Sequence, residues 1–513
     1  MRRRIVFCLI ISIILNVFSG CGLKEKVLET LEPEMNDEHQ NQNRQLPDTI
    51  SLALENAASL NPYDMQAASN LQAFRLLYEP LFSYDENMRV IPVLAESYSV
   101  SNGGLTAVVR IKDGIKCHDG SNLTGLDVLQ SVNQLLTKQT PYSYNVIQRA
   151  ELKDHRTVEF TFTKPQMNAK EQLMFPVIKT DGNSVFGTGA YKYVNKENTD
   201  TFVFSQFEEY HGEKPYIKNI KMINSPDFES VGRLFEIGET DILTSDAFDY
   251  STFNVKSDMS VYDYPKNEFV YIGINFDKVN FWGESTRQAL NYVIDKNEIV
   301  DKVLYKKATV ANFPINPKSW LYPKDKDTKK DTAYAEELML KDSWTRVDGV
   351  FARMVDGKRQ DFEISILVLD DEEMISVAEI IEKNLDNFGI KANTVIKGES
   401  EYWSMVANKE YDLLLNRTEL PASADFESLI GEGNVFGYLN STLNELVGSI
   451  RLQQDENVLK DSYAKCCDIF LKDMQFITLF FYKDAVVTGA DISDNVICSE
   501  DNPFYNISAW NRP

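Results

Sequence analysis

The sequence contains 513 residues, of which 53 are Lys or Arg and 77 are Asp or Glu, so its formal net charge is −24 at pH 7. A chain of this length can bury a core large enough for two or three subdomains. Its acidity argues against a nucleic acid as partner, because the phosphate backbone repels an acidic surface. We interpret the excess of acids as a solvated surface, with attraction of cationic ligands as the alternative.

The first residues have the pattern of an export signal. Arginines at positions 2–4 precede an apolar run over residues 5–18, which is short for a bilayer span and typical of a signal-peptide core. Two small residues then precede Cys21, as in a bacterial lipobox. The pattern predicts a signal peptide over residues 1–20 and lipidation of Cys21. A plain membrane anchor and a non-lipidated signal are the alternatives.

Residues 21–48 are predicted to form the lipidated cysteine and a flexible tether. They are polar and charged with few large apolar side chains, so they cannot bury enough surface to fold. A flexible chain of about 26 residues has an end-to-end distance of roughly 25–30 Å. We therefore expect a protein held by its lipid on the outer face of the cell membrane, on the extracellular side or in the periplasm.

Four cysteines follow in the part of the chain that should fold, namely Cys117, Cys466, Cys467 and Cys498. None belongs to a CxxC pair, and the four histidines are scattered along the chain, which argues against a zinc site. An exported protein can form disulfides, but the pairing cannot be deduced from spacing. Buried free thiols are the equal alternative.

In the first half, alternating residues predict strands over residues 49–55, 105–112 and 157–164. Residues 64–78 have helical spacing. Thr124 and Asp127 have the spacing of a capping box at the start of a helix. Ala95 and Glu96 are interpreted as part of a turn. These elements carry no recognisable catalytic chemistry.

The second half contains a regular alternation of strands and helices. Strands are predicted over residues 269–276, 362–369, 390–396, 411–415, 476–482 and 485–488, and helices over residues 372–388 and 399–408. The order from residue 362 predicts a parallel α/β unit, whose ligands bind beyond the carboxyl ends of its strands. Residues 416–426 are therefore a candidate binding loop. Residues 318–360, rich in lysine and aspartate, are interpreted as a surface excursion.

Seven short words occur along the chain in a set order and spacing. They are LYEPL at residues 77–81, PVLAES at 92–97, GL at 104–105, HDG at 118–120, DV at 127–128, GTGAY at 187–191 and YHG at 210–212. Together they resemble the signature of extracellular solute-binding proteins of family 5, the oligopeptide, dipeptide and nickel type that serves ABC importers. The resemblance extends over nearly all of the chain from Thr49 to Trp510.

This resemblance implies an α/β fold with two lobes, a periplasmic-binding-protein-like fold of class II in its three-subdomain type. The hinge between the lobes is expected near residues 266–276. The expected boundaries are residues 49–72, 178–268 and 477–513 for the N-terminal lobe (domain I), 73–177 for the extra subdomain (domain II) and 269–476 for the C-terminal lobe (domain III).

The resemblance also implies a substrate-binding lipoprotein of an ABC transporter. Such a protein, expected to be a monomer, captures short peptides in the interlobe cleft by hinge closure and delivers them to a membrane permease. The alternatives are a binding protein for nickel, a metal complex or an oligosaccharide, and a peptide-sensing signalling lipoprotein without import. Scattered histidines make metal capture the weaker variant. We expect no enzyme and no cofactor, because the chain has no GxSxG, HExxH or Walker sequence.

In peptide-binding members of the family, an aspartate a few positions before an aromatic-Leu helix start pairs with the free amino group of the peptide. Aligning Phe426 with that aromatic residue puts Glu419 at the anchoring position. A carboxylate in a closed cleft is costly unless a cation meets it, so it would select an ammonium group. Asp425 is the weaker alternative anchor and also has the position of a helix N-cap. The other interpretation of Glu419 is a solvated loop acid.

Overall fold

The computed structural model describes residues 48–512 apart from gaps at residues 58, 66, 139–145, 167–168, 183, 246–257, 278–282, 422–423, 451–452, 454 and 493–494. The described residues belong to one compact unit. The predicted signal peptide, Cys21 and all of the tether except its last residue lie outside the described residues, so they stay predictions.

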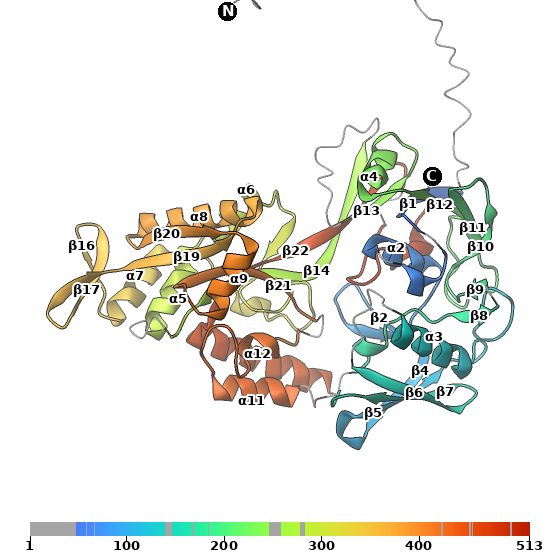
Figure 1. Ribbon diagram of the computed structural model, residues 1–513, viewed down its shortest axis with the longest axis horizontal. Helices are drawn as coiled ribbons and strands as arrows, with labels where there is room; N and C mark the ends of the chain where they lie inside the picture. The colour runs from blue at the N-terminus through green and yellow to red at the C-terminus, as the bar shows by residue number, and fades with distance from the viewer. Residues whose placement is uncertain are drawn as a thin grey trace, which may run out of the picture. The chain divides into compact units, whose positions relative to one another are not determined.

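Within the described residues, eleven strands form one mixed sheet that runs through the two lobes (Figure 1). Its order is β10 (Tyr191–Lys196), β11 (Thr201–Gln206), β12 (Asn219–Ser225), β1 (Thr49–Glu55), β13 (Ile242–Ser245), β22 (Phe476–Gly489), β14 (Met259–Ile274), β21 (Leu413–Glu419), β19 (Glu363–Leu369) and β20 (Lys391–Lys397), with β15 (Ala308–Val310) paired to β22.

Two long antiparallel strands, β14 and β22, connect the lobes. The C-terminal end of β22 pairs with β13 of the first lobe. The C-terminal half of β14 pairs with β21 of the second lobe. The β14–β22 register shifts between Pro265 and Phe269, close to the expected hinge. The sequence predicted shorter, separate strands here, because its local pattern breaks where the register shifts.

The parallel α/β unit of the second half is confirmed. Strand β19 pairs in parallel with β20 and β21, and the connecting helices are α8 (Glu372–Phe388) and α9 (Glu399–Ala407). Asp371 caps α8 by accepting a hydrogen bond from the Met374 amide, and Gly389 ends it at φ 92°. Strand β21 continues to Glu419 as an antiparallel partner of β14. The prediction of a loop from residue 416 was therefore wrong for residues 416–419.

The rest of the second lobe consists of helices and a small three-stranded sheet. These are α5 (Glu284–Val293), α6 (Lys296–Lys302), α7 (Thr332–Lys341), α10 (Glu427–Ile430), α11 (Ser441–Ile450), α12 (Glu456–Asp473), β16 (Thr345–Val347), β17 (Val350–Val355) and β18 (Lys358–Asp361). The interpretation of residues 318–360 as a surface excursion was wrong in part. Trp344 is fully buried and lies 4.5 Å from Phe362, centroid to centroid.

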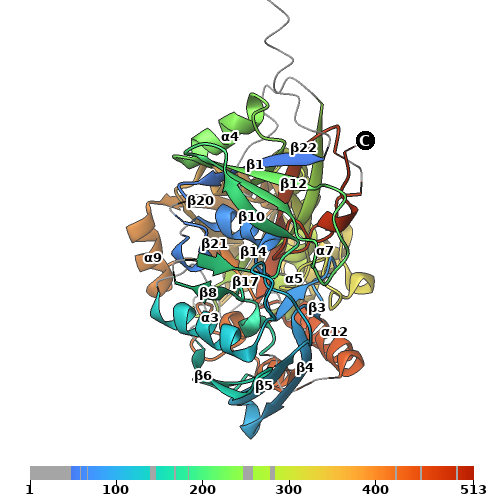
Figure 2. The same cartoon turned by 90° about the vertical axis from the view of Figure 1, so that its right-hand side faces the viewer.

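A second sheet of four strands, in the order β4-β5-β7-β6, lies in the first half of the chain. Its strands are β4 (Ala95–Ser101), β5 (Thr106–Ile111), β7 (Thr157–Phe162) and β6 (Ile147–Asp154). Helix α3 (Gly125–Thr137) contacts this sheet and β8 (Lys179–Asp181), as Figure 2 shows. The predicted capping box is confirmed, since Asp127 accepts from the amide and hydroxyl of Thr124 at 2.8 and 2.6 Å.

Short elements complete the first lobe. They are α2 (Ala68–Ala73), α4 (Phe228–Glu236), β9 (Ser184–Phe186), paired with β8, and the hairpin of β2 (Phe82–Tyr84) with β3 (Val90–Pro92). The helix predicted over residues 64–78 is shorter than expected, because 3₁₀ turns flank α2 on both sides. The turn predicted at Ala95 and Glu96 is instead the start of β4.

Three of the seven signature words meet at the side chain of Glu79, which is 7% exposed. Its carboxylate accepts from the hydroxyls of Thr188 at 2.8 Å and Tyr210 at 3.0 Å, and Nε2 of His211 lies 2.8 Å away. A Cβ on Gly187 would lie 1.9 Å from the backbone oxygen of Leu77. Three words distant in sequence are therefore held together by polar contacts and by a glycine that permits close approach of two backbones.

Candidate functional site

A cavity of about 600 Å³ has walls from both halves of the chain. One wall contains Glu96 and Tyr98 of β4 together with Phe82 of β2. The facing wall contains Ile450 of α11 and Tyr463 of α12. The volume lies within the range of about 300–1,000 Å³ that is typical of small-molecule sites.

The turn of the β2–β3 hairpin closes one side of this cavity against the second lobe. The Arg89 guanidinium carbon lies 4.5 Å from the centroid of the Trp320 ring, and the guanidinium pairs with Glu456 at the start of α12. The Trp320 amide also donates to the backbone oxygen of Asn87 at 3.0 Å. All three side chains, those of Arg89, Trp320 and Glu456, line the cavity.

The charged side chains of the cavity wall have both signs. Among the lining residues that the structure describes, Arg89, Lys164 and Lys170 are cations, and Glu96, Glu171, Asp425 and Glu456 are acids. The Lys170 ammonium lies 5.5 Å from the centroid of the Tyr98 ring, and burial raises the pKa of Tyr98 above its ordinary value. A wall of mixed charge suits a ligand that carries both donors and acceptors, as a peptide does.

Asp425 lies on the cavity wall and is partly buried. Its Oδ1 accepts a hydrogen bond from the Glu427 amide at 3.1 Å, at the start of α10. The N-cap of α10 is Phe426, one residue after Asp425, so the prediction of Asp425 as the N-cap was wrong by one position.

Glu419 is the last residue of β21, where it is exposed and stands opposite Glu268 in the β14 register. It is not among the described residues that line the cavity. Its negative charge nevertheless acts on Glu500, whose pKa is raised to about 8, first by burial and then by the charges of Asp501 and Glu419. Glu500 also accepts from the Asn267 amide nitrogen at 3.3 Å. Sequence reasoning did not select Glu500, because only the tertiary fold brings it near Glu419.

A second cavity, of about 730 Å³, has described lining residues that all fall between Ser59 and Phe204. Its polar side chains pair with one another, since Asn61 donates to Gln134 at 3.0 Å and Lys138 pairs with Asp64. Both partners of each pair come from the same lobe, so movement of the lobes would not close this cavity. The first cavity is therefore the better candidate for a site between lobes.

The described residues hold neither a disulfide nor a metal-binding group. Cys117, Cys466, Cys467 and Cys498 are buried free thiols, and burial raises the pKa of Cys117 to about 12. No group of three or more His, Cys, Asp or Glu residues suited to a metal ion occurs among the residues described. In the same part of the chain, no helix has both the length and the apolar character needed to cross a membrane.

Comparison with known proteins gives consistent matches over most of the chain. The family described as bacterial extracellular solute-binding proteins, family 5 Middle, matches residues 89–426. The oligopeptide-binding protein AppA of Bacillus subtilis (strain 168) is 24% identical over 474 residues, which cover 85% of this chain and 86% of that protein. The nickel-binding periplasmic protein of Escherichia coli (strain K12) is 24% identical over 491 residues, which cover 87% of this chain and 92% of that protein.

The fold also matches solved structures. The nickel ABC transporter structure from Bacillus halodurans has a TM-score of 0.75 to this chain at 17% identity, covering 89% of this chain and 98% of the other. This likeness confirms the predicted two-lobed α/β fold. It does not bear on the ligand, because identity this low supports the fold alone.

Proposed function

The chain belongs to family 5 of the bacterial extracellular solute-binding proteins, and on that premise we propose that it captures short peptides for an ABC importer. The peptide binds in the 600 Å³ cavity, hinge closure buries it between the lobes, and the closed protein delivers it to a membrane permease. The observation that carries this proposal is that the cavity takes its walls from both lobes.

The composition of the cavity supports a peptide over a metal. Its walls contain aromatic and aliphatic side chains beside both cations and acids, but no histidine among the described lining residues. Peptides need hydrogen-bonding groups of both kinds and roomy pockets for variable side chains. The name of the Bacillus subtilis relative also refers to oligopeptides.

A nickel complex is the second candidate, because the Escherichia coli relative is a nickel-binding protein of similar length and identity. A complex of nickel with a small organic ligand would need few ligands from the protein. An oligosaccharide remains the third possible ligand class, and sensing of a peptide without import is the alternative role.

We propose Glu419 as the anchor for the amino group of the peptide, with Asp425 as the weaker alternative. The position of Glu419 beside Glu500 supports this, because two neighbouring carboxylates are stabilised when a cation lies between them. Asp425 has the advantage of lining the cavity but already accepts from the Glu427 amide.

We also propose that the protein is a monomeric lipoprotein, anchored through Cys21 on the outer face of the membrane. The domain boundaries expected from the sequence stay part of this proposal. The register shift between Pro265 and Phe269 supports a hinge there, because a disrupted ladder bends more easily than a continuous one.

Native mass spectrometry of the protein purified from cells tests the ligand class. We expect bound species with the masses of short peptides, whose sequences fragmentation would identify. Recovery of nickel or a sugar alone would contradict the peptide proposal. Uptake of labelled peptide by cells with and without the protein then separates import from signalling.

A further inference from the structure

Lys170 lies on the wall of the 600 Å³ cavity with its ammonium group over an aromatic ring. Its Nζ is 5.5 Å from the centroid of the Tyr98 ring, and both side chains line the cavity. The Tyr98 ring packs edge to face with the buried ring of Phe82, at 5.7 Å between centroids. A ring face attracts an ammonium group but carries no net charge, so this contact does not neutralise the positive charge of Lys170.

The backbone at Lys170 is held by the core of the first lobe. Lys170 precedes a single 3₁₀ turn, Glu171–Leu173, and its carbonyl oxygen accepts from the Leu173 amide at 3.0 Å. Ala169 and Leu173, on either side of Lys170, are fully buried. Packing therefore fixes the point from which the lysine side chain reaches the cavity.

Three of the acids on the same wall already have partners from this chain. Glu456 pairs with Arg89, and Asp425 accepts from a backbone amide at the start of α10. Glu171 makes a hydrogen bond with the side chain of Tyr84. A carboxylate that already accepts hydrogen bonds gains less from a further donor on a ligand.

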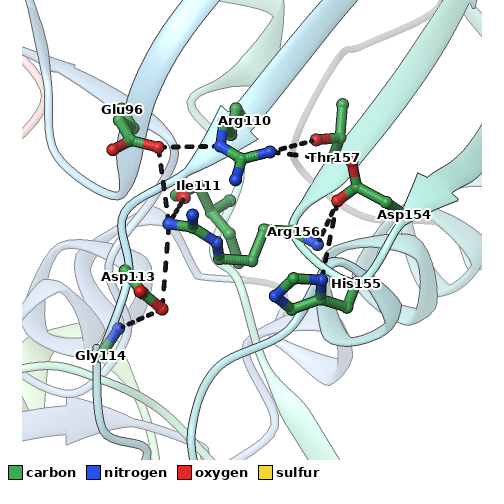
Figure 3. Close-up of polar contacts among 9 residues, drawn as sticks. All are labelled: Glu96, Arg110, Ile111, Asp113, Gly114, Asp154, His155, Arg156 and Thr157. Carbon is green, nitrogen blue, oxygen red and sulfur yellow. Dashed lines mark hydrogen bonds and ion pairs between the residues drawn. The ribbon is translucent and has the colours of Figure 1, made fainter.

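Glu96, the fourth acid, belongs to a network of ion pairs (Figure 3). Its Oε2 accepts from Arg110 at 3.1 Å and from Arg156 at 3.5 Å. Arg110 also pairs with Asp154 at 3.7 Å, and Arg156 pairs with Asp113 at 3.9 Å. These residues comprise three acids and two arginines, so the network adds no positive charge to the cavity wall.

Two lysines of the wall differ from these acids. Among the described residues, no carboxylate forms an ion pair with Lys164 or Lys170. Lys164 is exposed, whereas Lys170 is partly buried and lies over Tyr98. Because acids outnumber cations on the wall, selection of an anion depends on direct contact with a lysine and not on the summed charge, which water and salt screen.

The facing wall contributes several apolar side chains, among them Val447 and Ile450 of α11 and Leu459 of α12. Enclosure of a carboxylate against such side chains is costly unless a charged or hydrogen-bonding group meets it. The ammonium group of Lys170 has three N–H donors and no acceptor. It therefore suits a carboxylate and repels an amino group.

We propose that Lys170, placed over the Tyr98 ring, binds a carboxylate of the ligand. This carboxylate is the C-terminal group of a peptide or the side chain of an Asp or Glu within it, since both present the same two oxygens. The inference rests on the proposed peptide-binding function. It adds a subsite for negative charge to the proposed anchor of the amino group at Glu419.

The test uses the full-length protein in detergent and three pools of peptides of two to five residues, all with free amino termini. The first pool has uncharged side chains and a free C-terminal carboxylate. The second is the same pool with C-terminal amides, and the third has C-terminal amides and one Glu in each peptide. The protein is mixed with equal amounts of the three pools, each with its own isotope label. Mass spectrometry of the bound peptides then gives the ratio of each carboxylate pool to the uncharged amide pool.

We expect the wild type to prefer at least one carboxylate pool over the uncharged amide pool. Lys170→Met should reduce that ratio about tenfold, because a charge-assisted contact is lost. Lys170→Arg keeps the positive charge and should keep the ratio within about twofold of wild type. The pool whose ratio falls identifies the carboxylate as terminal or side-chain. A purely structural role for Lys170 would alter total binding but not the ratio.

Lys192→Met is the matched control. The Lys192 ammonium lies 5.5 Å from the centroid of the Phe207 ring, but Lys192 is not among the described residues that line either cavity. This variant should leave both ratios unchanged. Lys164→Met should reduce them less than Lys170→Met does, and Lys170→Ala is the second variant if Lys170→Met does not fold.

Unchanged ratios in a folded Lys170 variant would overturn the inference and leave the proposed function standing. So would a larger reduction in Lys164→Met, an equal reduction in Lys192→Met, or wild-type binding of all three pools alike. Failure of the wild-type protein to bind any pool would instead overturn the proposed function, and this inference with it.

Discussion

Nε2 of His211 lies 2.8 Å from Oε2 of Glu79, a carboxylate that also accepts from two hydroxyl groups and is almost fully buried. This contact joins two signature words that are more than 130 positions apart in the chain. Three of the signature words therefore form a structural polar centre in the first lobe, whereas residues of another word, PVLAES, line the candidate ligand cavity.

Removal of the Glu79 carboxylate should destabilise the protein. In Glu79→Ala the donors of Thr188, Tyr210 and His211 lose their acceptor in a buried place, which should cost about 3–5 kcal/mol. Urea unfolding measures the change. Glu208→Ala, which removes an exposed carboxylate paired with Lys214, is the control and should change the free energy of unfolding little. Equal losses in both variants would contradict the structural role of Glu79.

Gly187→Ala should be poorly tolerated. The added methyl group would overlap the backbone oxygen of Leu77, which cannot move without disturbing the hydrogen bond from Gly189 to the same oxygen. We expect a loss of at least about 3 kcal/mol or failure to fold. Gly448→Ala in α11 meets no atom within 4 Å and should stabilise by about 0.5–1 kcal/mol. Thermal unfolding measures the stability of the two variants. A stable Gly187→Ala protein would show that the backbones at Gly187 and Leu77 are not in close contact.

Lys296 should make stability depend on pH. Burial lowers its pKa from 10.5 to about 7, and Asp327 opposes this shift in part. Its ammonium nitrogen donates to Asn312 at 2.8 Å. Because the folded-state pKa lies below the unfolded one, the cost of burial is complete below pH 7 and is relieved as pH rises toward 10.5. The total change in the free energy of unfolding over this pH range is of the order of 5 kcal/mol.

Urea unfolding at several pH values between 7 and 10 checks this prediction. Because of this group, the free energy of unfolding of the wild type should rise by up to about 1.4 kcal/mol per pH unit, and Lys296→Met should abolish that rise. Lys302→Met, 65% exposed on the same helix, should keep it. The same slope in all three proteins would show that Lys296 keeps its proton after folding.

Glu419→Gln should weaken the binding of peptides with free amino termini by about 1.5–3 kcal/mol, the scale of a charge-assisted hydrogen bond. Peptides with acetylated amino termini should bind the variant and the wild type alike. Isothermal titration calorimetry measures the affinities for the free and the acetylated peptides. Glu399→Gln, an exposed change at the start of α9, is the control. Equal affinity of wild type and variant for free peptides would exclude Glu419, and Asp425 would be tested next.

Much of the fold could be predicted because local physics determines it. The bounds of α8 follow from a capping aspartate, an apolar stripe and a glycine, and all three are visible in the sequence. The same holds for the capping box of α3. Prediction was less accurate where strands pair over long distances, as in β14, β22 and the extension of β21 to Glu419, because pairing partners are not visible in a local pattern.

The sequence by itself determined the family, the order of the elements and the acidic residues available to meet a ligand. Only the tertiary structure decided which of those acids face a cavity and with which partners. Glu96 belonged to a predicted turn, and only the structure shows that it lies at a bulge in β4 with Arg110 and Arg156 in contact with its carboxylate (Figure 3). The physical reason is that the field at a carboxylate depends on charges close in space, and these come from strands distant in sequence.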